Sequence, residues 1–496
     1  MKISLVRRLL SVQVSTDEGC RLDHSSINTL SDDVLLCIFD SYRREWRPRL
    51  DRILWAIWPW TDLVHVCRRW RRIVFASPRY LKLYLTCKSK PDVQAALDIW
   101  PALPLDIHAN FDDEGADEDD IIGTLKHHDR LARIQIEGFN RYRLEKCIAL
   151  MKESFPILRC LDLRLTICEN KIYTTDAILG ESAPLLQRII LRGIWFPGLP
   201  KLLSSASDLV ILNLRGIPIT GEGDISPDAM VGTCLSVLTK LEFLTIFFLR
   251  RNSSPYPTDQ NPPPSTHTVL PALTYLSLEG PHSYLEGLVD RIDAPLLNFG
   301  DLNFLNEPIF DTPRVLQFIH RAKMFKLLGG VEVRFGRGSC FYPNADIVAS
   351  FRSSIGPTAF HLSFPCSGLP AQVAIMERIC AQWPSLVSHV ESLKLGDHFW
   401  NEQQWGEAIT PWLGFLRPFT AMQTLCFCGS PKVPRFVRML GELKGRGATD
   451  LLPALRTIEL GCSEEGVSEA LRLLRPFLVS REESGHPVVV NFGSRS

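Results

Sequence analysis

The residues best suited to chemistry are scattered along the chain. Cys426-x-Cys428 and His127–His128 carry side chains that bind metal ions, and Gly221-Glu-Gly223 contains part of a glycine-rich phosphate-binding pattern. Each stands alone, because the sequence has no C-x-x-C pair, no H-E-x-x-H, no G-x-x-x-x-G-K-[ST] and no G-x-S-x-G. We therefore expect no catalytic residue, no metal site and no cofactor, and we interpret Cys428 as packed on or beside a strand.

Composition and charge restrict the class of protein. The chain has 496 residues with 55 basic and 55 acidic side chains, so its formal charge is zero. A general binder of nucleic acid or anionic membrane needs a basic excess to neutralise phosphates, so neither partner is expected. Hydrophobic residues make up 45% of the chain, which is enough for a substantial core, and the 14 cysteines are too scattered for a disulfide scaffold.

The sequence predicts neither a leader nor a membrane span. Arg7 and Arg8 interrupt the apolar stretch of the N-terminal segment, which makes it a poor signal peptide. The longest notable apolar run, Ile53–Trp60, has eight residues, whereas a membrane helix needs about 20. We expect an intracellular protein with reduced thiols, in the cytoplasm, the nucleus or both.

A repeated apolar pattern begins near residue 129. Each copy follows the template anchor-x-L-x-x-L-x-L, where L is any apolar residue, with Gly300 as an exception at one apolar position. The mean spacing is about 29 residues, and the last five spacings are 31, 31, 31, 32 and 33. The alternating apolar residues at the end of each copy predict a short strand that buries one face. The predicted strands end at Ile136, Leu163, Leu191, Leu214, Ile246, Leu278, Leu302, Val333, Phe364, Leu395, Phe427 and Leu460.

Between two predicted strands lies enough chain for one helix, as in Asp176–Leu179 and Gly466–Leu478. The whole pattern resembles a leucine-rich repeat solenoid of the long, helix-containing type. The resemblance implies an α/β fold in which stacked parallel strands form a sheet with helices on its convex side. This region is expected to cover 100–491, with a capping strand in 103–109 and a last strand at Pro487–Asn491.

Three segments are predicted to lie outside regular structure. Residues 1–26 are polar or irregular and expected to be poorly ordered. Residues 112–120 hold seven carboxylates in nine positions; we interpret them as a solvated loop insertion, with an acidic docking site as the alternative. Residues 251–267 are rich in proline and serine and predict a second loop insertion, with regulatory phosphorylation as the alternative.

One residue of each predicted strand lies between its last two apolar positions and points to the opposite face. On a solenoid of ordinary curvature, these residues line the concave side, the default surface for binding a protein. The four carboxylates among them make this face somewhat acidic and hint at a basic or polar partner; the alternative is simple exposure to solvent. The residues are Gln135, Asp162, Ile190, Asn213, Thr245, Ser277, Asp301, Glu332, Ser363, Lys394, Cys426 and Glu459. The candidates for binding a target are Gln135, Asp162, Asn213, Asp301, Glu332, Lys394 and Glu459.

Residues 27–87 form a separate region with helical apolar spacing. Ser31 is a good N-cap for a first helix, whose apolar stripe is Val34, Leu35, Ile38 and Phe39. Thr61 or Asp62 can cap a second helix, whose stripe is Leu63, Val66, Cys67, Trp70, Ile73 and Val74. Ser77 and Pro78 end that helix.

Three motifs in this region occur in the order found in F-box proteins. They are Leu30–Phe39 (LSDDVLLCIF), Leu63–Arg71 (LVHVCRRWR) and Ser77–Leu81 (SPRYL). The region resembles an F-box, and with the repeats the chain is similar to fungal, basidiomycete-like F-box proteins with C-terminal leucine-rich repeats.

The F-box resemblance implies a helical module that binds a Skp-type adaptor and, through it, a cullin. Each aliphatic side chain buried at such an interface contributes about 1.5–3 kcal/mol. The pattern leaves open how many apolar residues form the module's own core, and Trp70 favours the core. The candidates for adaptor binding are Leu30, Val34, Leu35, Ile38, Leu63, Val66 and Trp70.

These patterns together predict a non-catalytic subunit of an SCF-type cullin-RING ubiquitin ligase. In this interpretation the helical module binds the adaptor and the repeats bind a target protein. The alternative is a leucine-rich repeat scaffold for protein interactions that has no role in a ubiquitin ligase.

Overall fold

The computed structural model divides the chain into two compact units, Met1–Leu85 and Thr86–Ser496. Its description covers residues 27–45, 63–77, 85–87, 103–111, 118–165, 172–173, 178–196, 198–217, 230, 234–248, 267–305, 313–322, 328–336, 347–353, 359–366, 369–398, 409–428, 435–443, 446–461 and 464–492. The predictions for 1–26, for 251–266 and for Gly221–Gly223 fall outside these residues.

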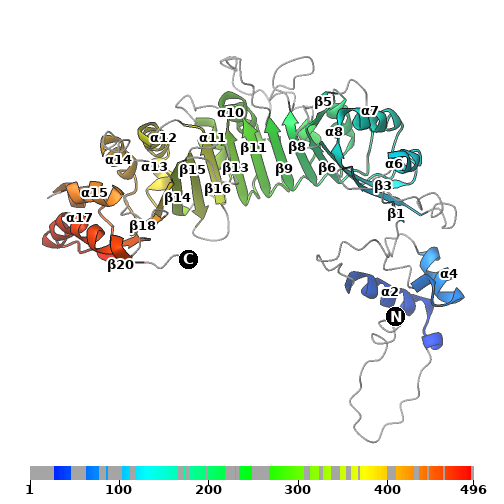
Figure 1. Ribbon diagram of the computed structural model, residues 1–496, viewed down its shortest axis with the longest axis horizontal. Coiled ribbons are helices and arrows are strands. Elements are labelled where there is room, and N and C mark those ends of the chain that lie inside the picture. The colour runs from blue at the N-terminus through cyan, green and yellow to red at the C-terminus, as the bar shows by residue number, and fades with distance from the viewer. Residues whose placement is uncertain are drawn as a thin grey trace, which may run out of the picture. The chain divides into compact units, whose positions relative to one another are not determined.

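The N-terminal unit is built around two helices, α2 (Asp32–Glu45) and α4 (Arg68–Ala76), preceded by the 3-10 turn η1 (Ile27–Thr29) (Figure 1). Phe39 of α2 packs on Trp70 of α4 with ring centroids 4.7 Å apart, and both side chains are buried. Arg69 joins the same two segments, because its guanidinium lies 2.6 Å from the Asp32 carboxylate and donates to the carbonyl of Leu30. An aromatic pair and one arginine therefore hold α2 against α4.

The two predicted helix starts in this unit have different outcomes. The N-cap at Ser31 is confirmed, since its hydroxyl accepts a hydrogen bond from the Val34 backbone N–H at 3.4 Å. The second helix does not run from Leu63: a short turn precedes it, and α4 begins at Arg68. Cys67 is its N-cap, because the thiol sulfur accepts from the Trp70 N–H. The first backbone N–H groups of a helix have no acceptor within the helix, and the Cys67 thiol supplies one in place of the usual hydroxyl or carboxylate.

A single sheet of sixteen strands runs through the second unit (Figure 1). Neighbouring strands along most of it are parallel. The strands in spatial order are β1 (Leu85–Cys87), β2 (Leu105–Asn110), β3 (Leu131–Phe139), β4 (Cys160–Leu165), β6 (Arg188–Arg192), β8 (Ile211–Ile217), β9 (Phe243–Phe248), β11 (Tyr275–Gly280), β13 (Phe299–Phe304), β16 (Ala359–Phe364), β15 (Ile347–Ser353), β14 (Leu328–Gly336), β17 (Ser392–His398), β18 (Thr424–Cys428), β19 (Thr457–Leu460) and β20 (Val489–Phe492). Two short pairs, β5 (Ile172–Tyr173) with β7 (Ile194–Trp195) and β10 (Thr268–Val269) with β12 (Ile292–Asp293), stand apart from it.

Helices connect successive strands and cover one side of the sheet. In Figure 1, α10, α11, α12 and α14 lie on the same side of the strands. The apolar residues that alternate along the strands are buried beneath these helices, as with Leu276 and Leu278. The helices and 3-10 turns are α6 (Glu118–Leu125), α7 (Arg141–Leu150), η2 (Leu179–Glu181), α8 (Leu199–Ser205), η4 (Leu235–Val237), α10 (His282–Asp290), α11 (Pro313–Arg321), α12 (Leu369–Gln382), α13 (Pro384–Val387), α14 (Ile409–Leu416), α15 (Arg435–Glu442), α16 (Arg446–Asp450) and α17 (Glu464–Glu483).

Most sequence predictions for this unit are confirmed at the level of a mixed α/β fold with a long, mostly parallel sheet, which is compatible with a leucine-rich repeat solenoid. All twelve predicted strand ends lie within strands of the sheet, and β2 and β20 correspond to the predicted first and last strands. Gly466–Leu478 lies in α17, whereas Leu179 begins only a 3-10 turn. Part of the predicted acidic loop is helical instead, because Glu118–Asp120 start α6.

The uniformly parallel order predicted from the repeat is wrong at β14–β16. These strands form an antiparallel meander, in which β15 pairs with β14 on one side and β16 on the other. β16 therefore neighbours β13, and β14 neighbours β17, so the two strands are exchanged relative to their order in the chain. Only five residues separate β15 from β16, and a parallel connection needs about a dozen or more, which leaves the antiparallel arrangement.

The position of β16 beside β13 explains why a glycine, Gly300, occupies an apolar position of the repeat pattern. Gly300 of β13 lies opposite Phe360 of β16 in the register. A Cβ atom on Gly300 would overlap the Phe360 ring. The buried phenylalanine brought in by β16 therefore occupies the space of the missing side chain.

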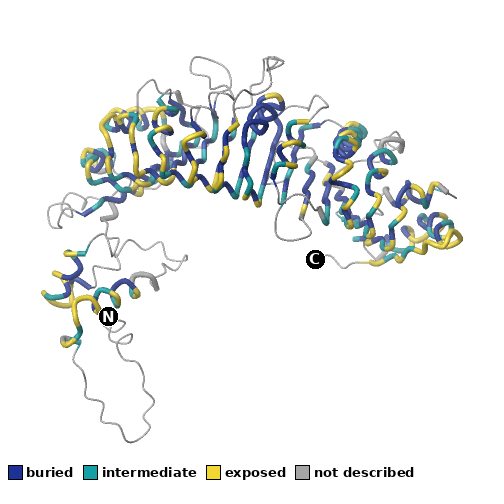
Figure 2. The backbone as a smooth tube through the Cα atoms, turned by 180° about the vertical axis from the view of Figure 1, so that it is seen from behind, coloured by how far each residue is buried: buried dark blue, intermediate teal, exposed yellow. Residues whose placement is uncertain are grey.

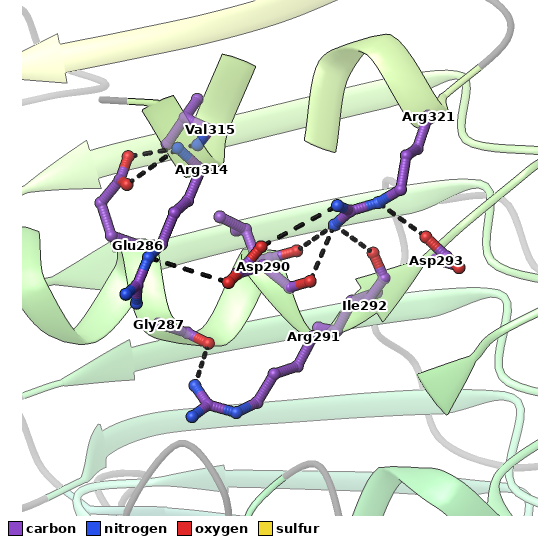
Figure 3. A network of polar contacts seen from close by, with 10 residues as sticks. Glu286, Gly287, Asp290, Arg291, Ile292, Asp293, Arg314, Val315 and Arg321 are labelled. Carbon is purple, nitrogen blue, oxygen red and sulfur yellow. Dashed lines mark hydrogen bonds and ion pairs between the residues drawn. The ribbon is translucent and has the colours of Figure 1, made fainter. Parts of the chain in front are cut away.

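Helix α10 is buried along most of its length (Figure 2). Figure 3 shows the polar network that joins it to α11. The Glu286 carboxylate accepts hydrogen bonds from the backbone N–H groups of Arg314 and Val315 in the first turn of α11, at 3.1 and 3.2 Å. Arg321, in the last turn of α11, lies 2.7 Å from the Asp293 carboxylate and donates to backbone carbonyls at the end of α10. Both ends of α11 are thus tied to the helix before it.

The exchange of β14 and β16 can be tested through Gly300. Gly300→Ala is expected to lower the free energy of unfolding by about 1–3 kcal/mol, because the added methyl group overpacks against Phe360. In a Phe360→Ala background the same substitution should cost much less, since the ring is absent. Unfolding of the four proteins of this double-mutant cycle measures the coupling.

Gly123→Ala is the matched control, because nothing lies within 4 Å of the added methyl group. It should leave stability unchanged or slightly raised, as a glycine is removed from a helix. An equal cost of Gly300→Ala in both backgrounds would show that Phe360 is not its neighbour.

The helix pair also predicts a pH dependence of stability. Burial raises the pKa of Glu286 to about 7, although the hydrogen bonds from Val315 and Arg314 oppose the shift. A carboxyl group with a raised folded pKa favours the folded state while it is protonated, so stability is lost as pH rises from about 4.5 to about 7, by up to about 3 kcal/mol. Glu286→Gln should remove this loss in thermal unfolding compared at about pH 5 and about pH 8. A Glu469→Gln control should retain it, and an unchanged pH dependence in Glu286→Gln would contradict the assignment.

Candidate interaction surfaces

The face of the sheet opposite the helices carries one aligned row of side chains from fifteen strands, β2 to β20. We call it the central row. The register places its members side by side on successive strands, including the exchanged ones. In spatial order they are His108, Gln135, Asp162, Ile190, Asn213, Thr245, Ser277, Asp301, His361, Ser350, Glu332, Lys394, Cys426, Glu459 and Asn491.

The seven residues predicted to bind a target all lie in the central row. Ser363 does not: it aligns with Asn303, two positions farther along β16, and His361 takes its place beside Asp301. Sequence reasoning also missed Ser350, because β15 has no copy of the repeat. The alternation of Ile347, Ala349 and Phe351 was the available signal for that strand.

Asp162 illustrates how the carboxylates of this face are held. Its side chain is buried and accepts two hydrogen bonds from the Arg164 guanidinium, each 2.8 Å long. The same guanidinium lies 2.8 Å from the Glu137 carboxylate. The hydrogen bonds that Arg164 donates to Asp162 raise the pKa of the guanidinium further above its usual range. Such bidentate pairs are among the stronger and more directional polar contacts.

Glu332 lies beneath three cations where β15, β14 and β17 meet. Its carboxylate is 2.7 Å from Arg334, 3.4 Å from Arg352 and 3.6 Å from Lys394. Its side chain is 8% exposed, whereas those of the three cations are 43–64% exposed. Burial alone would raise the pKa of Glu332, but the hydrogen bond from Arg334 and the three positive charges outweigh it and leave the pKa below its ordinary value.

The carboxylates of this face are more deeply buried than the cations paired with them. The face is therefore less acidic than the sequence suggested. Asp162, Asp301 and Glu332 are buried, and the arginines paired with Asp162 and Glu332 lie nearer the solvent. Asp301 instead accepts a hydrogen bond from the Ser277 hydroxyl at 3.1 Å. Of the four carboxylates counted from the sequence, only Glu459 is exposed. The charges that a partner would meet around Glu332 are therefore positive, whereas beside Asp162 it would meet Arg164 paired with Glu137.

The isolated chemical groups do not converge on a site. The thiols of Cys426 and Cys428 lie 3.4 Å apart on β18, and burial, the neighbouring thiol and Glu459 raise the pKa of Cys426 to about 12. His128 packs against Phe155, with Nδ1 3.0 Å from the Ser154 carbonyl oxygen. In the described parts of the chain, no group of three or more His, Cys, Asp or Glu side chains is placed to hold a metal ion.

The seven candidates for adaptor binding divide into interior and surface positions. Leu35, Leu63 and Trp70 are buried within the N-terminal unit. Val34 and Val66 are 45% and 50% exposed, while Leu30 and Ile38 are half-buried. The apolar surface available to a partner is therefore carried by Val34, Val66, Ile38 and Leu30.

Comparison with known proteins adds little to this description. No protein-family model matches the sequence, and no curated protein matches it. Among solved structures, the chain is similar to the leucine-rich repeat-containing protein LegL7 from Legionella pneumophila, at 10% sequence identity and a TM-score of 0.21, over 79% of this chain and 97% of that chain. A likeness this weak carries no functional weight, so the surfaces rest on their own geometry. Among the described residues, no helix combines the length and apolar character needed to cross a bilayer.

The buried position of Glu332 leads to a prediction about stability. Glu332→Gln leaves Arg334, Arg352 and Lys394 without their common counter-charge, and we expect a loss of about 2 kcal/mol at neutral pH after allowance for solvent screening of the cations. Because the folded pKa is depressed, the contribution is present above the unfolded pKa and is lost as pH falls, so the two proteins should converge in acid. Thermal unfolding across this pH range measures the difference.

Glu459→Gln provides the control, since it removes an exposed carboxylate from the same row. It should have little effect at any pH. Equal destabilisation by Glu332→Gln and Glu459→Gln would contradict the role given to the buried position.

Proposed function

We propose that this chain is a non-catalytic protein-interaction subunit whose sheet binds a target protein along the face opposite the helices. The central row carries the proposal, because it continues without interruption over fifteen neighbouring strands. At about 4.8 Å per strand, this row is about 65 Å long. Repeat proteins use extended faces of this kind to bind other proteins.

For the N-terminal unit, we propose the function implied by the F-box resemblance, which is binding to a Skp-type adaptor. The motifs Leu30–Phe39 and Leu63–Arg71 support it, as do the exposed valines at 34 and 66. Small surfaces of this type bind through a few apolar anchors. The adaptor would join the chain to a cullin-RING ligase, and the chain would speed ubiquitin transfer by holding the target near the ligase.

A second function is favoured by a different observation. Leu35, Leu63 and Trp70, which the motifs share with adaptor-binding modules, are buried in the core of the unit. With fewer apolar anchors at the surface, the chain can serve as an interaction scaffold that has no link to a ligase. The two functions differ in whether the N-terminal unit binds an adaptor.

Adaptor binding is tested with the full chain co-expressed with a tagged Skp-type adaptor. We expect the two proteins to co-purify. A combined Val34→Asp and Val66→Asp variant should bind at least about tenfold more weakly, because each aspartate would be desolvated at the interface. The measurement is the titration of the purified chain against the adaptor.

The Val479→Asp variant is the control, because Val479 is an equally exposed valine, 43% accessible, on α17. It should bind like the parent chain. Absence of adaptor binding by the parent chain would favour the scaffold. Equal binding by the parent, the double variant and the control would show that the exposed valines do not contact the adaptor.

A further inference from the structure

One stretch of the polar face carries positive charge and no carboxylate. Strands β6, β8 and β9 contribute nine positions to this face, three from each strand. Three are arginine, two are phenylalanine, two are isoleucine, and the others are Asn213 and Thr245. In chain order, the nine are Arg188, Ile190, Arg192, Ile211, Asn213, Arg215, Phe243, Thr245 and Phe247.

The arginines of this stretch are aligned across neighbouring strands. Arg164, Arg192 and Arg215 are successive partners in the register of β4, β6 and β8. Their Cα atoms are therefore about 5 Å apart from one strand to the next. Asp162 and Glu137 compensate Arg164, whereas no described carboxylate forms an ion pair with Arg192 or Arg215, and Glu279 acts on Arg215 only from farther away.

Arg192 carries a hydrogen-bond donor that no described residue satisfies. Its Nε atom is buried and has no hydrogen-bond partner among the described residues. Burial and the like charges of Arg164 and Arg215 lower its pKa. An anion placed over the accessible part of the Arg192 guanidinium would relieve the repulsion from Arg164 and Arg215.

Aromatic rings continue the same surface. The Arg215 guanidinium lies over the ring of Phe247, 4.4 Å from its centroid. Phe243 is 40% exposed and packs against Tyr275, which stacks on Phe299 at 4.8 Å with an interplanar angle of 7°. Arginine and aromatic side chains that are partly exposed beside one another are the usual composition of an interface hot spot.

We propose that Arg192, Arg215 and Phe243 anchor an extended protein segment that presents carboxylates to the two arginines and an apolar side chain to Phe243, about 13 Å away along the strand direction. The inference deepens the proposed function, since it names the chemistry of the target on the same face. The carboxylates bind the two guanidiniums, for which bidentate pairing is the preferred geometry. The apolar side chain packs against the exposed Phe243 ring.

A peptide fits this surface better than a nucleic acid does. Glu137 of β3 and Glu279 of β11 lie beyond the arginines on either side and would repel a continuous phosphate backbone. Tyr275 and Phe299 stack on each other, so the space between their faces is closed to a base. A short acidic segment needs only the carboxylate-free stretch of β6, β8 and β9.

The test uses the full chain and a phage-displayed library of random peptides about 12 residues long, which in extended form would span about 40 Å. Selection on the parent chain should enrich peptides with Asp or Glu about four residues from Leu, Ile or Phe, because that spacing along an extended chain matches the distance from the arginines to Phe243. A fluorescein-labelled copy of the most enriched peptide is then titrated by fluorescence anisotropy. Its affinity should fall when salt is raised from about 50 mM to about 300 mM.

Two variants decide whether the patch is responsible. Arg192→Gln combined with Arg215→Gln should weaken the selected peptide at least about tenfold, and Phe243→Ser should also weaken it. The control combines Arg141→Gln with Arg472→Gln, which removes two exposed helix arginines with the same change in net charge. The control should bind like the parent, and thermal unfolding should show that all variants remain folded.

Three results would overturn the inference: no enrichment, enrichment of peptides without acidic residues, or equal binding to the Arg192→Gln/Arg215→Gln variant and the control. Adaptor co-purification is measured on the same variants. If one of these results occurs while adaptor binding is normal, the peptide site is rejected and the proposed ligase link is unaffected. If the parent chain does not bind the adaptor, the ligase link is rejected and the peptide site is unaffected.

Discussion

In-register pairing of neighbouring strands is the constraint on which the surface of this protein depends. The residues of the central row are far apart in the chain, and only the backbone hydrogen bonds of the sheet bring them together. Because side chains alternate between faces, a shift of one residue in any strand would bury a polar side chain and expose an apolar one. The apolar residues beneath the helices therefore fix the register, and the register in turn fixes which polar side chains lie side by side.

The same alignment determines the charge of the face. Counting one residue per strand gave four carboxylates and one lysine, which suggested an acidic surface. The neighbouring positions, two residues along each strand, carry Arg164 and Arg334, which pair with Asp162 and Glu332. A buried carboxylate is stable only with such partners, and the longer arginine side chains can reach it while remaining near the solvent. The burial that stabilises the sheet thus leaves the outer layer of this face positive around Glu332.

The sequence predicted the strands better than it predicted their neighbours. Apolar alternation is a local property, so all twelve predicted strands are present, although most of them continue beyond the predicted end. The order of β14 and β16 depends on how the chain turns after β13, and the regular spacing of 31 residues gave no sign of the exchange. Two local signals were present, the short link before β16 and the glycine at position 300. Neither can be interpreted without knowing that β16 pairs with β13, a strand distant in sequence. For the same reason the pattern identified the central-row residues of β3–β13 but placed Ser363 where His361 lies.

In the N-terminal unit, one set of apolar residues must serve two purposes. A pair of short helices has few apolar side chains, and each one buried between them is withdrawn from the surface. Phe39 and Trp70 pack together and leave Val34 and Val66 substantially exposed. Sequence periodicity shows that a residue lies on an apolar stripe, but it cannot divide the stripe between the inside of the unit and a partner, since both environments favour the same side chains. That division is set by the angle at which α2 and α4 pack, which the Arg69–Asp32 ion pair helps to hold. Two exposed valines contribute the free energy of apolar burial only when another surface covers them, and this is the physical reason to look for the partner of the module at these two positions.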